Sequence, residues 1–218
     1  MGGGALLHRD SRIDELMLEL AGSTRPRICY VGTASAHQPE RVELFYDAFR
    51  GRPCEPTHLE LFGMPDEPAR HVAKQDVIYV GGGNTANMLA IWRVHGIDRA
   101  LRDVWERGAV LGGMSAGANC WFEDSVTDSY GPRLRTLEGG LGLLRGSFCP
   151  HYDGEPERRP AFTRLVRDRS LPPGYAADDD AALHFAGTEL REVVSQREGA
   201  RGYHVTPEGE EPLEARLL

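Results

Sequence analysis

The chain has 218 residues, 40% of them hydrophobic, and a formal net charge of −8. This length fits one domain spanning residues 1–218, with enough apolar residues for a sizeable core. The acidic balance argues against a nucleic-acid partner, because phosphate binding requires a basic surface. No apolar run is long enough to cross a bilayer, and the first residues lack the pattern of a secretory signal. We therefore expect a cytoplasmic protein that binds neither nucleic acid nor membrane.

The cysteines argue against a disulfide framework or a zinc site. Cys29, Cys54, Cys120 and Cys149 form no Cys-x-x-Cys pair, and Cys29 and Cys120 lie in or beside apolar runs. Such cysteines are typical of free thiols in a protein core. We expect no metal and no cofactor.

The first half of the chain alternates between strand-like and helix-like segments. In chain order these are a helix at 11–21, a strand at 27–31, a helix at 39–50, a strand at 57–62, a strand at 77–80, and helices at 85–95 and 97–107 separated by Gly96. The helix at 39–50 is amphipathic, and its pattern places Val42, Leu44, Phe45 and Phe49 toward the core. Alternation of this kind predicts parallel strands with helices on both faces of the sheet.

The second half has shorter and more closely spaced elements. We expect strands at 109–112, 142–148, 174–178, 181–186, 190–195 and 201–205, with a helix at 156–169. Turns at Gly187 and at Glu198–Gly199 favour antiparallel pairing near the C-terminus, and the polar residues 207–218 are expected to fray. The fold class is therefore α/β, a mostly parallel doubly wound sheet with antiparallel strands at its end.

The start of the chain departs from this fold class. A doubly wound sheet usually opens with a strand before its first glycine-rich turn, whereas this sequence opens on Gly2-Gly3-Gly4. Either that first strand is absent or the chain starts further upstream.

The sequence Gly-Met-Ser-Ala-Gly at 113–117 follows the apolar run Ala109-Val110-Leu111. It is typical of a nucleophile elbow, a sharp turn between a strand and a helix that exposes a serine hydroxyl. Gly113 and Gly117 allow strand and helix to approach closely. Ser115 is the candidate nucleophile, and the backbone N–H of Ala116 can donate to an oxyanion.

A serine hydroxyl needs a base to remove its proton, normally a histidine oriented by a carboxylate. His151 follows an apolar run directly, as expected at the carboxyl end of a strand, where α/β sheets build their sites. Asp128 is our choice for the carboxylate, with Asp124 second and Asp153 third. Each of these acids could instead stabilise a turn or a helix end.

The segment Gly81-Gly82-Gly83-Asn84 follows the strand at 77–80 and opens the next helix. Glycines there let the main chain approach a substrate, so this loop can supply the second oxyanion donor. A dinucleotide-binding loop is a weaker reading, because Ala86 occupies the last glycine position of that motif. The alternative is a purely structural role, in which this loop only caps the helix that follows.

Four segments together resemble the dipeptidase E (aspartyl dipeptidase) family of serine peptidases, and more distantly cyanophycinase. They are Tyr-Val-Gly-Gly-Gly-Asn-Thr, Gly-Met-Ser-Ala-Gly-Ala-Asn, Val-Thr-Asp-Ser and Phe-Cys-Pro-His-Tyr-Asp. The resemblance implies a class I glutamine-amidotransferase-like α/β fold and metal-free hydrolysis of short peptides by a Ser-His-Asp/Glu triad. It places the nucleophile on Ser115, the base on His151 and the carboxylate near Asp128. The oxyanion donors fall on Gly83 and Ala116, with Gly82 and Asn84 beside the substrate.

One feature of the sequence differs from this family pattern, and one further segment resembles it. Aspartyl dipeptidases carry an arginine between the elbow and the triad carboxylate that pairs with the substrate Asp, whereas this chain has Val126 in that region. Specificity for N-terminal Asp is therefore doubtful. The segment at 176–183, which contains Asp178, Asp179 and Asp180, resembles a family turn whose acidic residue lies near the site. Its carboxylates could hold a substrate α-ammonium group or form a solvated turn.

Other functions remain open at this point. An esterase or amidase of the same fold would use the same residues, and a non-catalytic sensor or scaffold could retain the fold without using them. The presence of both Ser115 and His151 disfavours the sensor. A homodimer is compatible with the fold and the size.

Overall fold

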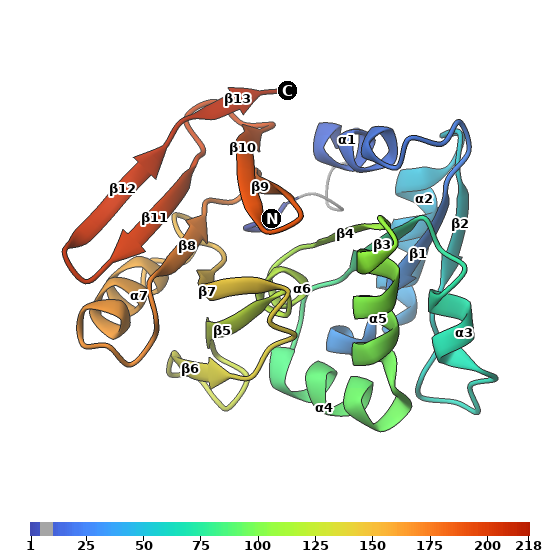
Figure 1. Cartoon of the computed structure of the whole chain (residues 1–218), viewed down its shortest axis with the longest axis horizontal. Helices are drawn as coiled ribbons and strands as arrows, with labels where there is room; N and C mark the ends of the chain where they lie inside the picture. The colour runs from blue at the N-terminus through green and yellow to red at the C-terminus, as the bar shows by residue number, and fades with distance from the viewer. Residues whose placement is uncertain (5–10) are drawn as a thin grey trace. The chain divides into compact units, whose positions relative to one another are not determined.

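The computed structural model describes residues 1–4 and 11–218; His8 and its neighbours at positions 5–10 lie outside the described residues. The chain divides into two compact units, one of residues 6–117 and one of residues 1–5 and 118–218. We describe each unit by itself (Figure 1).

The unit of residues 6–117 contains a parallel sheet in the order β2-β1-β3-β4. Its elements are α1 (Arg12–Leu20), β1 (Arg27–Val31), the 3-10 turn η2 (Thr33–Ser35), α2 (Pro39–Phe49), β2 (Glu55–His58), α3 (Pro68–Val72), β3 (Val77–Val80), α4 (Thr85–His95), α5 (Ile97–Glu106) and β4 (Val110–Gly113). All four residues of β3 are buried. Because successive side chains of a strand point to opposite faces, both faces of the sheet are covered at β3.

Local sequence explains where these helices begin and end. The side chain of Asn84 caps α4 by accepting a hydrogen bond from the Asn87 amide at 2.8 Å. Gly96 adopts a left-handed conformation with φ of 69°, which ends α4 and separates it from α5. Pro39 opens α2, whose buried stripe is Phe45, Ala48 and Phe49.

Two expectations for this unit need correction. Leu44 is 45% exposed, because the buried stripe of α2 runs through Phe45 and leaves the preceding residue at its edge. The strand expected at 57–62 ends at His58. Beyond it, Leu59 and Leu61 are buried, whereas Phe62 is 49% exposed. The short helix α3 has no counterpart among the expected elements.

The second unit contains a six-stranded mixed sheet and a three-stranded sheet, in the orders β12-β11-β8-β7-β5-β6 and β13-β10-β9. Its elements are β5 (Phe122–Thr127), β6 (Arg135–Glu138), β7 (Leu144–Cys149), α7 (Arg158–Arg167), β8 (Gly174–Ala177), β9 (Ala181–Ala186), β10 (Glu189–Ser195), β11 (Gly202–Thr206), β12 (Gly209–Leu213) and β13 (Ala215–Leu217). The short helix α6 (Ala116–Asn119) spans the division between the units.

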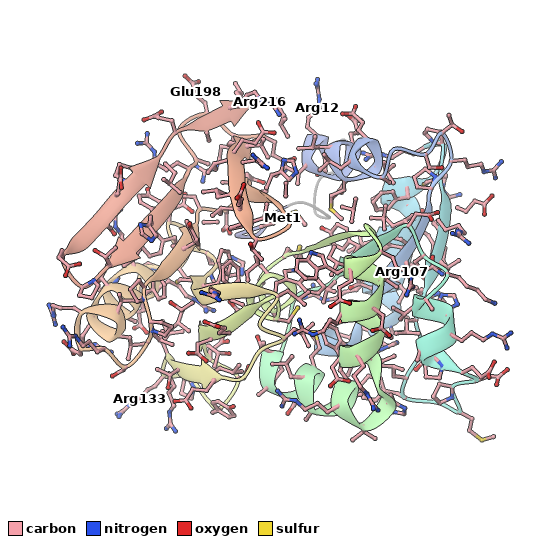
Figure 2. The ribbon with its side chains drawn as sticks, viewed as in Figure 1. Met1, Arg12, Arg107, Arg133, Glu198 and Arg216 are labelled. Carbon is pink, nitrogen blue, oxygen red and sulfur yellow. The ribbon has the colours of Figure 1, made fainter. Side chains whose placement is uncertain are left out.

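The core of the second unit lies between α7 and the mixed sheet. Phe162 and Val166 of α7 pack with Cys149 of β7 and Ala176 of β8. Charged side chains such as Arg133 and Glu198 point outward into solvent (Figure 2). The parallel pairs β5–β7 and β7–β8 sit beside antiparallel pairs, which confirms the α/β class with antiparallel strands toward the C-terminus.

The C-terminal residues are ordered into strands rather than frayed. β11 and β12 form an antiparallel hairpin, and β13 pairs with β10. Glu210 of β12 accepts a hydrogen bond from the Tyr152 hydroxyl at 2.6 Å and forms an ion pair with Arg159 of α7. These polar contacts hold a segment whose sequence lacks an apolar pattern.

Candidate active site

The turn after β4 has the geometry of a nucleophile elbow. Ser115 has φ of 55°, a left-handed conformation that is uncommon for a residue with a side chain. Such strain costs about 1–3 kcal/mol and is concentrated at functional sites. The amide of Gly117 donates to the Met114 carbonyl at 2.9 Å, which closes the turn beneath Ser115.

The two glycines that flank Ser115 are required by close contacts in the same unit. A Cβ atom on Gly113 would overlap the carbonyl group of Gly117. A Cβ atom on Gly117 would overlap the carbonyl group of Val80, the last residue of β3. The elbow can therefore pack against the neighbouring strand only when both positions lack side chains.

The glycine loop after β3 lies against the elbow. A Cβ atom built on Gly82 would be 3.2 Å from the Cβ atom of Ser115 and 3.7 Å from its Oγ atom. Gly83 has φ of 140°, and a Cβ atom there would overlap the Ala34 carbonyl. The amide of Asn84 donates to that same carbonyl at 2.8 Å. Gly82, one of the residues expected to approach a substrate, thus lies beside the candidate nucleophile, and Gly83 follows it against Ala34, all within one unit.

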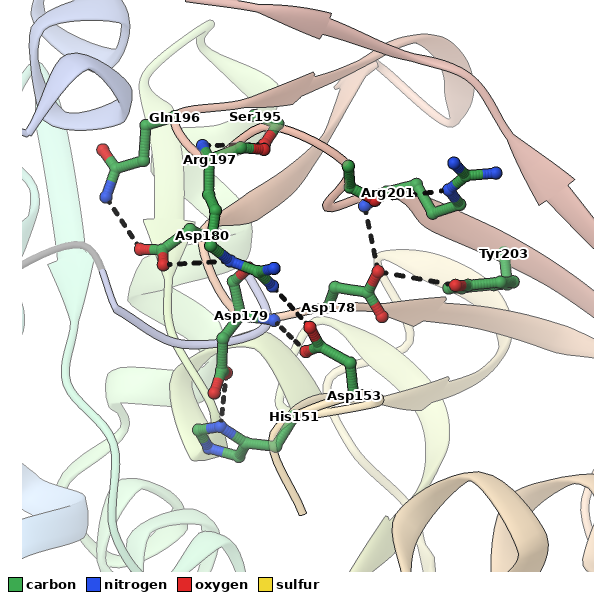
Figure 3. Close-up of polar contacts among 11 residues, drawn as sticks. His151, Asp153, Asp178, Asp179, Asp180, Ser195, Gln196, Arg197, Arg201 and Tyr203 are labelled. Carbon is green, nitrogen blue, oxygen red and sulfur yellow. Dashed lines mark hydrogen bonds and ion pairs between the residues drawn. The ribbon is translucent and has the colours of Figure 1, made fainter. Parts of the chain in front are cut away.

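The second unit contains a histidine–carboxylate pair (Figure 3). Nδ1 of His151 lies 2.7 Å from Oδ1 of Asp179, and the His151 side chain is 21% exposed. His151 follows β7 and Asp179 follows β8, and these two strands are parallel neighbours in which Cys149 is opposite Ala176. The carboxyl ends of adjacent parallel strands thus bring the two side chains together.

Asp179 is closely enclosed. A Cβ atom on Gly3 would overlap Oδ1 of Asp179 and lie 2.8 Å from Nδ1 of His151, and one on Gly154 would overlap Oδ2 of Asp179. The hydrogen bond with His151 holds the pKa of Asp179 below its ordinary value. The carboxylate is therefore ionised and held in one position against the imidazole.

The three carboxylates chosen from the sequence lie elsewhere in the same unit. Asp128 forms an ion pair with the buried Arg158, with Oδ2 3.6 Å from Nη2. Asp124 accepts a hydrogen bond from the Gly139 amide at 3.3 Å, and burial raises its pKa. Among the described residues, the carboxylate within hydrogen-bond distance of the His151 imidazole is that of Asp179. Asp128 follows β5, which pairs with β7 on the side away from β8.

Asp153 organises the turn that carries Asp179. It accepts a hydrogen bond from the Asp179 amide at 2.9 Å and forms an ion pair with Arg197 (Figure 3). Arg197 also contacts Asp180, with Nε 3.5 Å from Oδ2. Asp153 and Asp180 therefore share one guanidinium group.

Asp179 is absent from the carboxylates expected beside His151, because the sequence pattern suggests the turn at Asp178–Asp180 for a substrate ammonium group instead. The signal that indicates Asp179 is its place after β8, the parallel neighbour of the strand before His151. The N-terminal glycines run along this turn. The Gly2 amide donates to the Ala181 carbonyl at 3.1 Å, and the Asp180 amide donates to the Gly3 carbonyl at 3.1 Å. Residues 1–4 form no strand.

Some properties concern the described residues as a whole. Their four cysteines are free and buried, as expected. Within residues 1–4 and 11–218, no group of three or more His, Cys, Asp or Glu side chains is arranged to hold a metal ion. The helices in this part of the chain are too short or too polar to cross a membrane.

Comparison with known proteins identifies the family. The model described as Peptidase family S51 matches residues 1–193 of the chain. The chain belongs to peptidase family S51. The serine peptidase class predicted from the sequence is thereby confirmed.

Two similar sequences and one solved structure agree with this family assignment. The chain is 48% identical over 206 residues to "Uncharacterized peptidase YgaJ" of Bacillus subtilis (strain 168), covering 94% of this chain and 89% of that protein. It is 34% identical over 106 residues to "Peptidase E" of Salmonella arizonae, covering 48% and 46%. The crystal structure of a peptidase from an acI-B1 Actinobacterium superposes with a TM-score of 0.76 at 20% identity, covering 99% and 92%. This last likeness confirms the fold.

Proposed function

We propose that the protein is a serine exopeptidase that hydrolyses short peptides through an acyl-enzyme. Ser115 is the nucleophile, His151 the general base, and Asp179 the carboxylate that orients His151. The observation that carries the proposal is the 2.7 Å contact between Nδ1 of His151 and Oδ1 of Asp179. It fixes the proton on Nδ1, so that Nε2 has a lone pair with which to accept the serine proton.

The proposed reaction has two halves. Nε2 of His151 removes the proton of Ser115 as Oγ attacks the scissile carbonyl, and the N–H groups of Gly83 and Ala116 donate to the oxyanion. His151 then returns the proton to the leaving amine, which departs and leaves an ester on Ser115. In the second half, His151 deprotonates a water molecule that attacks the ester, and the serine is released with its proton.

The assignment of Asp179 replaces Asp128 in the role that the sequence suggested. Asp128 forms an ion pair with Arg158, whose side chain is only 4% exposed, and together with Glu155 at 2.7 Å it compensates the charge of that arginine. Asp179 instead has a direct contact with the imidazole and a pKa lowered by it. We therefore assign a catalytic role to Asp179 and a structural role to Asp128.

Specificity for acidic peptides is not part of the proposal. Val126 is fully buried in the core against α7, and it has no cationic group to offer a substrate carboxylate. Arg133 and Arg135, which follow it in the chain, are both exposed.

The test is mass spectrometry of a library of di- to tetrapeptides after incubation with wild-type protein or Ser115→Ala. We expect wild-type protein alone to release terminal residues, while the variant keeps the wild-type circular dichroism spectrum and melting temperature. Hydrolysis of p-nitrophenyl acetate without peptide cleavage would favour the esterase. Loss of neither activity in Ser115→Ala would rule out Ser115 as the nucleophile.

A further inference from the structure

The unit that carries Ser115 also has a small open pocket of about 240 Å³. It is lined by Thr33, Ala34, Ala36, Phe62, Asn87, Ala90 and Ile91. These residues come from the turn η2, the segment after β2, and the first turns of α4. Pockets for drug-sized ligands measure roughly 300–1,000 Å³, so this one suits a single side chain.

The pocket shares a wall with the loop expected to hold the oxyanion. Ala34 lines the pocket, and its carbonyl group lies directly against Gly83 and accepts the Asn84 amide. Gly82, one residue earlier, lies against Ser115. A peptide whose scissile carbonyl is held at Gly83 and Ser115 therefore has a neighbouring residue within reach of the pocket, and all of these contacts lie inside one unit.

The chemistry of the lining is apolar. Phe62, Ala36, Ala90 and Ile91 present hydrocarbon surface, Asn87 supplies an amide, and none of the lining residues is charged. Phe62 is 49% exposed, so about half of its ring surface is available to contact a ligand. Burying its ring and the opposing side chains against a ligand would stabilise binding through the hydrophobic effect.

A network of hydrogen bonds and ring contacts holds the pocket walls in place. The Trp92 indole of α4 donates to the Thr33 hydroxyl at 3.1 Å, and Nε2 of His37 lies 3.4 Å from the same hydroxyl. Nδ1 of His37 lies 3.4 Å from Oε2 of Glu60, and its ring packs edge-on against Phe62 with centroids 5.0 Å apart. This network joins η2, α4 and the segment after β2, so the pocket is preformed.

We propose that this pocket binds an apolar side chain of the peptide, on the residue at one side of the scissile bond. The proposal rests on the proposed role of Ser115 and names the substrate class: short peptides with an aliphatic or aromatic residue rather than an acidic one. An aspartate side chain would lose hydration here without gaining a cationic partner.

The experiment compares two dipeptide series, Xaa-Ala and Ala-Xaa, in which Xaa is Gly, Ala, Leu, Phe or Asp. For wild-type protein we expect kcat/KM to rise roughly tenfold or more from Ala to Leu or Phe in one series only, because each methylene in an apolar pocket contributes about that factor. The series that responds identifies whether the pocket holds the acyl or the leaving residue. A flat profile in both series, or a preference for Asp, would overturn the proposal.

Two variants test the site itself. Ala90 is an exposed residue of α4, so Ala90→Phe fills the pocket from a surface position without disturbing the core. We expect it to lower kcat/KM for Leu and Phe substrates about tenfold while that for Ala-Ala changes less than about threefold. Phe62→Ala should also lower kcat/KM for the Leu and Phe substrates more than that for Ala-Ala. Val94→Phe on the same helix, at a side chain 81% exposed and outside the pocket, is the matched control.

The ester p-nitrophenyl acetate separates this proposal from the proposed function. Its acetyl group is too small to need a pocket on the acyl side, so if the dipeptides place the pocket there, the pocket variants should hydrolyse the ester at the wild-type rate. If they place the pocket on the leaving side, where the nitrophenyl ring could enter it, trifluoroethyl acetate serves instead, because both of its groups are small. Ser115→Ala should hydrolyse neither ester. An equal loss on all substrates in Ala90→Phe, or the same loss in Val94→Phe, would refute the pocket assignment. Cleavage of none of the dipeptides would refute it too, and ester turnover would then show whether Ser115 remains a nucleophile.

Discussion

Nδ1 of His151 and Oδ1 of Asp179 are 2.7 Å apart, although 28 positions separate the two residues in the chain. The pairing of β7 with β8 brings them together, since each residue lies two positions beyond the end of one of these parallel strands. The contact has the chemistry of the base–carboxylate half of a serine peptidase. It supports the proposed role of Asp179 as the carboxylate that orients His151, which local sequence around the elbow could not indicate.

The first prediction separates the candidate carboxylates. Asp179→Asn should lower kcat by about two to four orders of magnitude, because an amide cannot stabilise the imidazolium or fix its tautomer as a carboxylate does. Asp128→Asn should retain kcat within about threefold of wild type, with any effect appearing in the melting temperature through Arg158. Steady-state kinetics on a cleaved dipeptide measures both. A large loss in Asp128→Asn with little in Asp179→Asn would restore the assignment suggested by the sequence.

The contrast between Ser115 and Asp179 shows what the sequence could predict. Ser115 lies in a local motif in which strand, turn and glycines are all visible within a few residues. The position of Asp179 beside His151 depends on which strands are neighbours, and the sequence predicts a strand at 174–178 but not that it pairs with β7. β5 and β12 are not predicted from the sequence for a similar reason. Their sequences are polar, and they form strands because adjacent strands supply their main-chain hydrogen-bond partners.

The elements that the sequence predicts best are the helices and buried parallel strands within residues 6–117. β1, β3 and α4 have the expected bounds, because apolar runs and capping residues such as Asn84 and Gly96 determine them locally. Leu44 was not predictable from periodicity alone, since the width of a buried stripe depends on what packs against it.

The second prediction concerns the N-terminal glycines. Gly3→Ala places a methyl group against both His151 and Asp179, so it should lengthen their hydrogen bond and lower kcat at least about tenfold. Gly3 does not need a positive φ, so alanine is acceptable to its backbone. Gly63→Ala, whose nearest contact is 4.0 Å, is the control. The NMR signal of the His151 Nδ1 proton should shift in Gly3→Ala alone, and an unchanged signal with unchanged kcat would contradict the packing argument.

The third prediction concerns the glycine loop. Gly83→Ala must displace the loop from the Ala34 carbonyl and with it the proposed oxyanion donor, so kcat should fall about 100-fold or more. Gly131→Ala also has a strongly positive φ, 133° against 140° for Gly83, but meets no atom within 4 Å, so it shares the backbone strain without the overlap. Activity and melting temperature of the two variants distinguish a local effect from general destabilisation. Equal activities would argue against Gly83 as a donor.

The fourth prediction concerns stability and pH, and it involves Asp14 of α1. Asp14 is fully buried, and burial raises its pKa from 3.8 to about 7. Between these values the folded protein binds a proton that the unfolded chain has released. The free energy of unfolding should therefore fall as pH rises from about 4 to about 7, and level off above that. The loss from this group is at most about 4 kcal/mol, since one pKa unit corresponds to about 1.4 kcal/mol.

Asp14→Asn removes this titration while keeping nearly the same side-chain shape. Urea unfolding at pH 5 and pH 8 should show a smaller difference between the two pH values for Asp14→Asn than for wild-type protein. Glu19→Gln, an exposed carboxylate of the same helix, should leave the wild-type difference unchanged. If Asp14→Asn and wild-type protein lose the same stability between pH 5 and pH 8, the buried carboxyl group is not the source. A confirmed effect would identify ionisation of the buried Asp14 as a source of destabilisation above pH 5.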